Sequence, residues 1–139
     1  MKIVIGSDHA GLEYKTKIVS FLEENNHLVL DVGTHTKESV DYPDYAHMVA
    51  EEVLLGADFG VLICGSGNGV SMAANKHDGI RAAICWSGEI AKLARNHNNA
   101  NIISLPARFT TIKETIDIIQ IFLKESFEGG RHIKRVEKI

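Results

Sequence analysis

The chain is poor in several residue types that mark specialised classes of protein. Only two of its 139 residues are cysteine, and Cys64 and Cys85 have the spacing of neither a disulfide framework nor a cysteine-rich zinc site. It has two prolines, no internal repeat and no low-complexity stretch, so nothing indicates a linker between domains. We therefore expect a single domain covering residues 1–139, large enough for one hydrophobic core.

Long apolar runs are also missing. No stretch approaches the ~18 consecutive apolar residues that a membrane-spanning helix needs. The first residues turn polar after position 5, so we expect neither a signal peptide nor a membrane partner. The net charge of −3 and a pI near 6.1 argue against a general nucleic-acid binder. These absences predict a cytoplasmic protein that acts on a small molecule.

Short apolar runs alternate with amphipathic segments along the whole chain. Strands are expected at residues 2–5, 27–32, 59–64, 80–85 and 101–105, and helices at 13–25, 41–55, 68–76, 89–96 and 111–126. This alternation predicts parallel βαβ units, hence a three-layer α/β/α sandwich with a five-stranded parallel sheet of Rossmann-like or flavodoxin-like type. The pattern does not fix the strand order, for which the flavodoxin-like order is our expectation. Ligands of such folds bind beyond the carboxyl ends of the strands.

The segment after the third expected strand, residues 64–69, contains three glycines and opens a helix. Such a loop can bind an anion through its backbone N–H groups, although a tight turn without a ligand has the same composition. The dinucleotide fingerprint and the P-loop lysine are both absent. Cys64 begins this segment, where the helix N-terminus can lower a thiol pKa. Cys64 is a candidate base or nucleophile, and the alternative is a small buried hydrophobic residue.

Three other segments carry polar candidates. Asp8 and His9 follow the first strand and can orient each other or bind a sugar or phosphate, although Asp8 can also cap a helix. His97 is a candidate general acid or base, or a histidine stabilised by a helix C-terminus. Residues 129–139 carry a net charge of +3, leaving −6 elsewhere. Arg131 and Arg135 are spaced to share one helical face and hold a phosphate, although a solvated basic terminus has the same pattern.

Taken together, these segments resemble the family of B-type ribose-5-phosphate isomerases and galactose-6-phosphate isomerase subunits. The resemblance covers essentially the whole chain and rests on residues 6–11, 31–34, 41–43, 64–69, 73–76, 95–101 and 129–132. It implies a cofactor-independent aldose–ketose isomerase that interconverts ribose 5-phosphate and ribulose 5-phosphate through a cis-enediolate, in the pentose phosphate pathway. It also implies a homodimer or a dimer of dimers whose active site draws residues from two subunits.

The resemblance implies a role for each candidate residue. His97, assisted by Asp8, opens the sugar ring, and Cys64 then removes the C2 proton. The oxyanion is held by the Ser66 hydroxyl and the backbone N–H groups of the loop, which are those of Gly65, Ser66, Gly67, Asn68 and Gly69. The phosphate binders are His9, Arg108, Arg131 and Arg135, and the sugar contacts are Tyr42 and Asn98. One branch of the family has a glutamate base where this chain has Val70, which leaves Cys64 as the base.

Two alternatives remain at the level of the sequence. The same chemistry could act on a six-carbon aldose phosphate, such as allose 6-phosphate or galactose 6-phosphate. The depth of the pocket decides which sugar fits, and the sequence does not give that depth. A nucleotide-binding regulatory module could use the same fold, although the missing phosphate-loop signatures count against it. His27, His35, His47 and His77 show no metal-ligand spacing, so no metal is expected.

Overall fold

The computed structural model describes all 139 residues. The strands are β1 (Lys2–Ser7), β2 (Leu28–Asp31), β3 (Phe59–Cys64), β4 (Ala82–Ile84) and β5 (Ile102–Pro106). The helices are α1 (Leu12–Glu24), α2 (Tyr42–Leu54), α3 (Asn68–Ala74), α4 (Gly88–Asn98), α5 (Ile112–Lys124) and α6 (Ile133–Val136), with two 3-10 turns, η1 (His9–Gly11) and η2 (Gly130–His132). Every expected element is present, and most boundaries agree within two residues.

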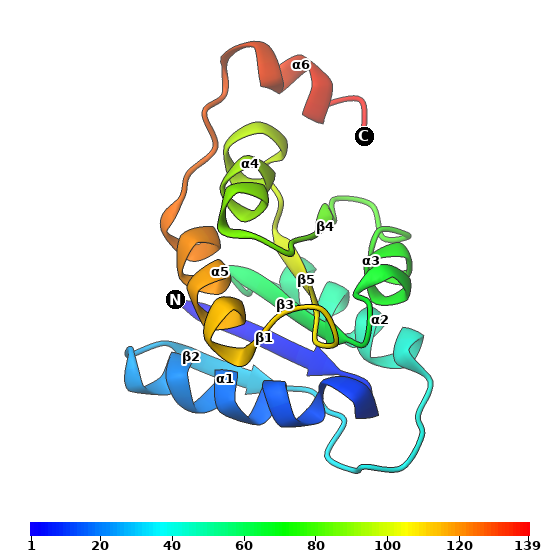
Figure 1. Cartoon of the computed structure of the whole chain (residues 1–139). Helices are drawn as coiled ribbons and strands as arrows, with labels where there is room; N and C mark the ends of the chain where they lie inside the picture. The colour runs from blue at the N-terminus through cyan, green and yellow to red at the C-terminus, as the bar shows by residue number, and fades with distance from the viewer.

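All five strands are parallel and lie in the order β2-β1-β3-β5-β4 (Figure 1). The expected α/β fold with a five-stranded parallel sheet is confirmed. The flavodoxin-like order β2-β1-β3-β4-β5 is wrong in its last two strands. Here β5 pairs with β3, and β4 forms the edge of the sheet. The short β4 lacks the fully buried pattern of β5, which fits a strand with only one neighbour.

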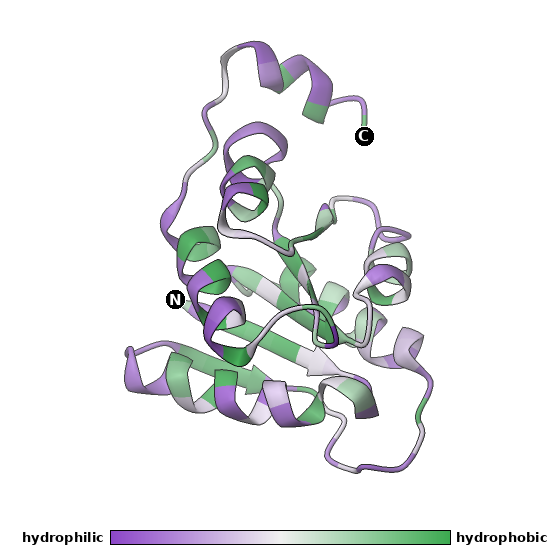
Figure 2. Ribbon diagram, viewed as in Figure 1, coloured by the Kyte–Doolittle hydropathy of each residue, from purple (hydrophilic) through white to green (hydrophobic).

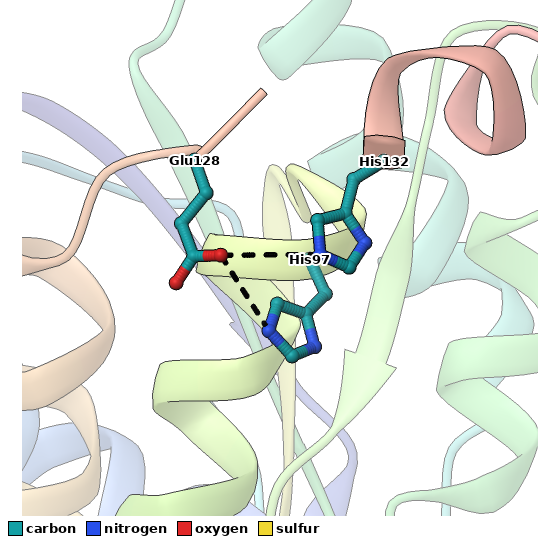
Figure 3. A group of neighbouring side chains, drawn as sticks. All are labelled: His97, Glu128 and His132. Atoms are coloured by element: carbon teal, nitrogen blue, oxygen red, sulfur yellow. Dashed lines mark ion pairs between the residues drawn. The ribbon is translucent and has the colours of Figure 1, made fainter. Parts of the chain in front are cut away.

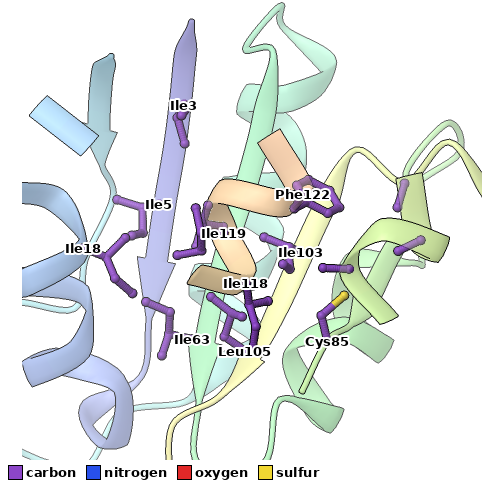
Figure 4. Close-up of a cluster of buried hydrophobic side chains, with 14 of the residues drawn as sticks. Ile3, Ile5, Ile18, Ile63, Cys85, Ile103, Leu105, Ile118, Ile119 and Phe122 are labelled. Atoms are coloured by element: carbon purple, nitrogen blue, oxygen red, sulfur yellow. The ribbon is translucent and has the colours of Figure 1, made fainter. Parts of the chain in front are cut away.

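Two hydrophobic layers enclose the sheet. On one face, side chains such as Ile5, Ile63 and Leu105 pack against α1, α4 and α5 (Figure 4). On the other face, Val4 and Leu62 pack against α2 and α3. Successive residues of a strand point to opposite faces, and both faces are covered, which is why β1, β3 and β5 are mainly apolar. Hydrophobic residues accordingly concentrate in the strands and the adjoining helix faces (Figure 2).

Glycine allows α2 to lie close to the sheet. A Cβ atom at Gly6 would stand 2.9 Å from the Val49 side chain, and one at Gly60 would stand 2.8 Å from it. Because contacts this short are not tolerated, α2 can reach its position only over these glycines. This packing fixes the start of α2, and therefore Tyr42, near the carboxyl edge of the sheet. None of the helices is both long and apolar enough to cross a membrane.

The chain beyond α5 turns back along α4. Asn96 donates from its amide to the Ser126 carbonyl (2.7 Å) and accepts a backbone bond from Glu128 (3.0 Å). The two short helices η2 and α6 follow, and they extend beyond α4 away from the body of the domain (Figure 1). The mainly hydrophilic C-terminal segment is thus attached to the end of α4 (Figure 2).

Candidate active site

The centre of the candidate site is the turn between β3 and α3. Cys64 is the last residue of β3, and Gly67 takes a left-handed conformation (φ 76°) that lets the chain enter α3 directly. The Ala107 N–H donates to the Cys64 carbonyl (2.9 Å), and the Arg108 N–H donates to the Gly65 carbonyl (3.1 Å). These bonds tie the glycine turn to the end of β5. The expected glycine loop therefore lies at the carboxyl edge of the sheet.

Cys64 and Asp8 form a direct pair. The Cys64 Sγ donates a hydrogen bond to Asp8 Oδ2 (3.0 Å), and both side chains are buried. The second carboxylate oxygen, Oδ1, accepts bonds from the backbone N–H groups of Ala10 (3.0 Å) and Gly11 (3.1 Å). Asp8 therefore caps η1 and holds the thiol at the same time. The structure confirms the capping interpretation of Asp8 and adds a bond to Cys64 that was not expected from the sequence, while a contact of Asp8 with a sugar or phosphate stays a prediction.

The Cys64 thiol is held in its protonated form. Burial, followed by the hydrogen bond and negative charge of Asp8, raises the pKa of Cys64 above its ordinary value. The backbone N–H groups of Ser66 and Gly67 act in the opposite direction but do not outweigh these effects. The lowering effect of the helix N-terminus on the pKa is therefore present, as the sequence indicated it could be, and burial and the adjacent carboxylate outweigh it.

Several other candidates surround this pair. A Cβ atom at Gly69 would overlap the Tyr42 ring, and one at Gly65 would lie 3.2 Å from Nε of Arg108. The two glycines thus let an aromatic ring and a guanidinium approach the loop closely. Ser66 Oγ accepts a bond from the Asn68 N–H (3.3 Å). His9 begins η1, next to Asp8, and its Nδ1 accepts from the Val40 N–H (3.4 Å).

The remaining candidates lie at the opposite edge of the sheet. His97 and Asn98 occupy the last turn of α4, just before the start of β5. The Asn98 carbonyl accepts a bond from Nε of Arg81, which immediately precedes β4. The length of β5, about 16 Å, thus separates this end of the sheet from Cys64. One chain does not bring His97 and Asn98 together with the thiol.

Arg131 and Arg135 also lie at this far edge. Arg131 lies in η2 and Arg135 in the adjoining α6, and both side chains are exposed. Neither forms an ion pair within the chain, so both guanidinium groups are available to a phosphate. The site expected from the sequence is therefore divided into two groups of residues.

His97 has neighbours that were not among the candidates. Its imidazole stacks on that of His132, with ring centroids 4.2 Å apart and planes inclined by 10°. Nε2 of each ring lies near the same oxygen of Glu128, at 3.8 Å from His97 and 3.9 Å from His132 (Figure 3). Burial, with smaller effects from His97 and Arg131, lowers the pKa of His132. Nothing in the sequence connects residues 128–132 with residue 97, and only the four-residue spacing of Glu128 and His132 hints at a pair.

The fold and the residues at the carboxyl edge of the sheet define a class of protein: an α/β enzyme with a buried thiol–carboxylate pair beside a glycine turn. The ribose/galactose isomerase family model matches residues 3–139, and the chain belongs to this family. The expected family resemblance is thus confirmed over nearly the full length.

Individual relatives agree with this assignment. Ribose-5-phosphate isomerase B of Escherichia coli is 44% identical, over 99% of this chain and 93% of the relative. The solved structure of the Clostridium thermocellum ribose-5-phosphate isomerase B has a TM-score of 0.98 and 50% identity, covering 99% of this chain and 94% of that one. The Mycoplasma genitalium enzyme, solved with bound ribulose 5-phosphate, has a TM-score of 0.95 and 46% identity, covering 99% and 92%.

Proposed function

We propose that this protein interconverts ribose 5-phosphate and ribulose 5-phosphate. The observation that carries the proposal is the buried Cys64–Asp8 pair beside the glycine turn, in a member of the ribose/galactose isomerase family. Removal of a proton from a carbon next to a carbonyl requires a base, and the oxyanion that develops requires hydrogen-bond donors. The turn that begins at Cys64 supplies both. Relatives that carry this enzyme's name, one of them solved with ribulose 5-phosphate, support the five-carbon substrate over a six-carbon one.

Cys64 acts as the base after its proton passes to Asp8. The thiolate removes the C2 proton of the open aldose, and the electron pair of that C–H bond forms the double bond of the cis-enediolate, with negative charge on O1. Cys64 then returns the proton to C1, the O2 proton moves to O1, and the ketose carbonyl forms at C2. Asp8 finally returns its proton to Cys64, which restores the resting pair. The reaction is redox-neutral. Backbone N–H groups of residues 65–69 and the Ser66 hydroxyl stabilise the oxyanion.

The other group of residues acts on the substrate from a second copy of the chain. His97 opens the ring together with Asp8, and Asn98 contacts the sugar beside Tyr42. Arg131 and Arg135 bind the phosphate together with His9 and Arg108. Because the two groups lie at opposite edges of one sheet, a complete site needs two chains, as a homodimer or a dimer of dimers. A hollow of about 440 Å³ beside Ser66, flanked by the exposed Trp86 and Phe109, offers apolar surface for such contact.

Replacement of the proposed base tests this function. We expect Cys64→Ala to lower kcat by about 10²–10⁴-fold, because the C2 proton then has no acceptor. Cys85→Ala is the matched control, since that thiol is buried in the core and touches no candidate residue. Both variants are assayed with ribose 5-phosphate and allose 6-phosphate, and their fold is checked by circular dichroism. Full activity in folded Cys64→Ala protein contradicts the mechanism, and a faster reaction with the six-carbon sugar contradicts the substrate.

Cellular location and pathway complete the proposal. The likeness to relatives named as ribose-5-phosphate isomerase B supports a cytoplasmic enzyme, and the proposed reaction belongs to the pentose phosphate pathway. No cofactor enters the proposed steps. Fractionation of cells and detection of the protein in the cytosolic fraction test the location.

A further inference from the structure

The proposed mechanism uses His97 but leaves its two closest polar neighbours without a role. His97, Glu128 and His132 each present one ligand atom, and these atoms all lie within 4.8 Å of one another. No other set of three histidine, cysteine, aspartate or glutamate side chains in the chain has its ligand atoms this close together. The His97 side chain is partly buried, that of His132 is nearly inaccessible, and the Glu128 carboxylate reaches them from the solvent side. We refer to these three residues as the triad (Figure 3).

The backbone around the triad holds its members in place. The Glu128 N–H donates to the Asn96 carbonyl (3.0 Å), which fixes Glu128 beside the last turn of α4. Gly129 and Gly130 both have positive φ values, 68° and 55°, and together they reverse the chain over a few residues. This turn returns His132 to the carboxylate four positions before it. The backbone of the triad is therefore positioned by the end of α4, the Glu128 N–H bond and the glycine turn.

The donors of the triad suit one class of ligand. Two imidazole nitrogens and one carboxylate oxygen are the protein ligands of many zinc sites that keep a fourth position open. Tetrahedral ligands about 2.0–2.2 Å from a metal lie roughly 3.3–3.6 Å from one another. The two imidazole–carboxylate separations, 3.8 and 3.9 Å, exceed this by a few tenths of an ångström, and all three ligand atoms lie within 4.8 Å. The nearly parallel rings must also tilt so that their nitrogens converge. Nitrogen-rich sites favour zinc, nickel and cobalt over magnesium and calcium.

We propose that His97, Glu128 and His132 form a site for one divalent transition-metal ion of the zinc class, and that metal bound there inhibits the enzyme. The inhibition rests on the proposed function, because a metal bound to the His97 imidazole prevents that group from opening the sugar ring. The exposed Arg131 and Arg135 repel a cation, so only metals with a strong preference for nitrogen overcome this cost. The site would let a rise in free zinc slow the isomerase reversibly.

Binding is measured first, independently of activity. Untagged full-length protein is stripped with EDTA and titrated with Co²⁺, whose visible absorption reports a tetrahedral site. We expect one Co²⁺ per chain, displaced by Zn²⁺ and unaffected by millimolar Mg²⁺. Glu128→Gln and His132→Asn should each weaken Co²⁺ binding more than tenfold. Glu137→Gln, on the same segment, and the double variant His47→Asn/His77→Asn, which removes the other close histidine pair (2.8 Å), are controls that should bind normally.

Inhibition is then scored as the ratio of activities with and without Zn²⁺ for each protein, so that a change in basal rate does not enter. We expect Zn²⁺ to inhibit wild type, EDTA to restore it, and His132→Asn to be insensitive. Failure of Co²⁺ to bind, or equal binding by all variants, overturns the site. Binding at the triad without inhibition overturns the inhibitory role. A protein without isomerase activity contradicts the proposed function instead, and the Co²⁺ titration still tests the site.

Discussion

A single carboxylate carries two duties at the centre of this enzyme. Asp8 uses one oxygen to hold the N–H groups of Ala10 and Gly11 and the other to accept the proton of Cys64. The first duty fixes the carboxylate, and the second keeps the thiol uncharged until substrate arrives. An uncharged thiol is a poor target for oxidants and alkylating agents, because the thiolate is the reactive form. In the proposed mechanism, the group that protects the resting thiol is also the one that later accepts its proton.

Removal of the Asp8 charge should make the Cys64 thiol more reactive. In Asp8→Asn the amide oxygen can still accept from Ala10 and Gly11, but the negative charge that raises the pKa of Cys64 is lost. We therefore expect the pKa of Cys64 to fall and its alkylation by iodoacetamide at pH 8 to speed up. The pH at which alkylation is half-maximal should move down relative to wild type. Mass spectrometry of the modified peptide, over a series of pH values, measures both effects.

Cys85 serves as an internal control in the same samples. Burial raises the pKa of Cys85 to about 12, and Asp8 is not among the causes. Its modification should remain slow at pH 8 in both proteins. Equal alkylation rates at Cys64 in wild type and Asp8→Asn would show that burial alone sets its reactivity.

At the scale of elements, helix α5 shows how local sequence sets a boundary. Thr111 accepts a bond from the Glu114 N–H at its hydroxyl (3.2 Å), and Glu114 accepts one from the Thr111 N–H (2.7 Å). This reciprocal capping box ties both residues at the first turn. The bonds from Thr111 lower the pKa of Glu114, since they favour its charged form. The amphipathic α5 supplies Ile118, Ile119 and Phe122 to the larger core layer.

Loss of this cap should weaken the whole domain. We expect Thr111→Ala to reduce the free energy of unfolding by about 1 kcal/mol, the usual cost of removing a threonine N-cap. Urea denaturation followed by circular dichroism measures the change. Thr16→Ala is the control, because Thr16 lies exposed inside α1, where alanine is the better helix former. A Thr111→Ala protein as stable as wild type would mean that core packing alone sets the start of α5.

The C-terminal segment permits a test of phosphate binding. Arg135→Ala should raise the KM for ribose 5-phosphate about tenfold or more, since a charge-assisted bond to phosphate is lost. The effect on kcat should be smaller, because the role proposed for Arg135 is to bind the phosphate and not the reacting carbons. Lys134→Ala, an exposed neighbour in the same helix, is the matched control. Steady-state kinetics distinguishes the two, and an unchanged KM in Arg135→Ala removes this residue from the phosphate site.

The elements themselves were largely predictable because their signals are local. Apolar runs mark β1 and β3, and the spacing of Ile18 and Leu22 marks the buried face of α1. The exchange of β4 and β5 was not predictable, because strand order depends on which crossover packs best and leaves no periodic signal. The net direction of the Cys64 pKa was not predictable for a similar reason. Burial, its largest cause, and Asp8, which is 56 positions away, both depend on the tertiary fold, whereas the glycine turn that lowers the pKa is adjacent.

At the scale of the molecule, the topology of the sheet places the candidate site residues at two opposite edges. Parallel strands bring Asp8, Cys64 and Arg108 to one edge, while every helix that returns between strands ends at the other. His97, at the end of α4, therefore cannot share an edge with Cys64. The residue types could be selected from the sequence, but their division into two groups depends on the direction of each element. A second copy of the chain is the simplest way to reunite them.

Mixing two inactive variants tests whether two chains share one site. Cys64→Ala lacks the base and His97→Asn lacks the ring-opening imidazole, so each homodimer should be inactive. If Cys64 of one chain works with His97 of the other, a mixed dimer has one intact site and one site lacking both groups. Random re-pairing of equal amounts makes about half of the dimers mixed, so activity should recover to about a quarter of wild type.

The mixing of the Cys64→Ala and His97→Asn variants needs its own controls. Denaturing and refolding the variants together allows the chains to re-pair, whereas each variant refolded alone should stay inactive. Cys64→Ala refolded with a double variant, Cys64→Ala/His97→Asn, should also stay inactive, because no chain in that mixture carries the thiol. If each site used Cys64 and His97 of the same chain, no mixture could recover activity, since every chain would lack one of the two groups. Size-exclusion chromatography confirms that the refolded chains associate, so that an inactive mixture of dimers contradicts the shared site directly.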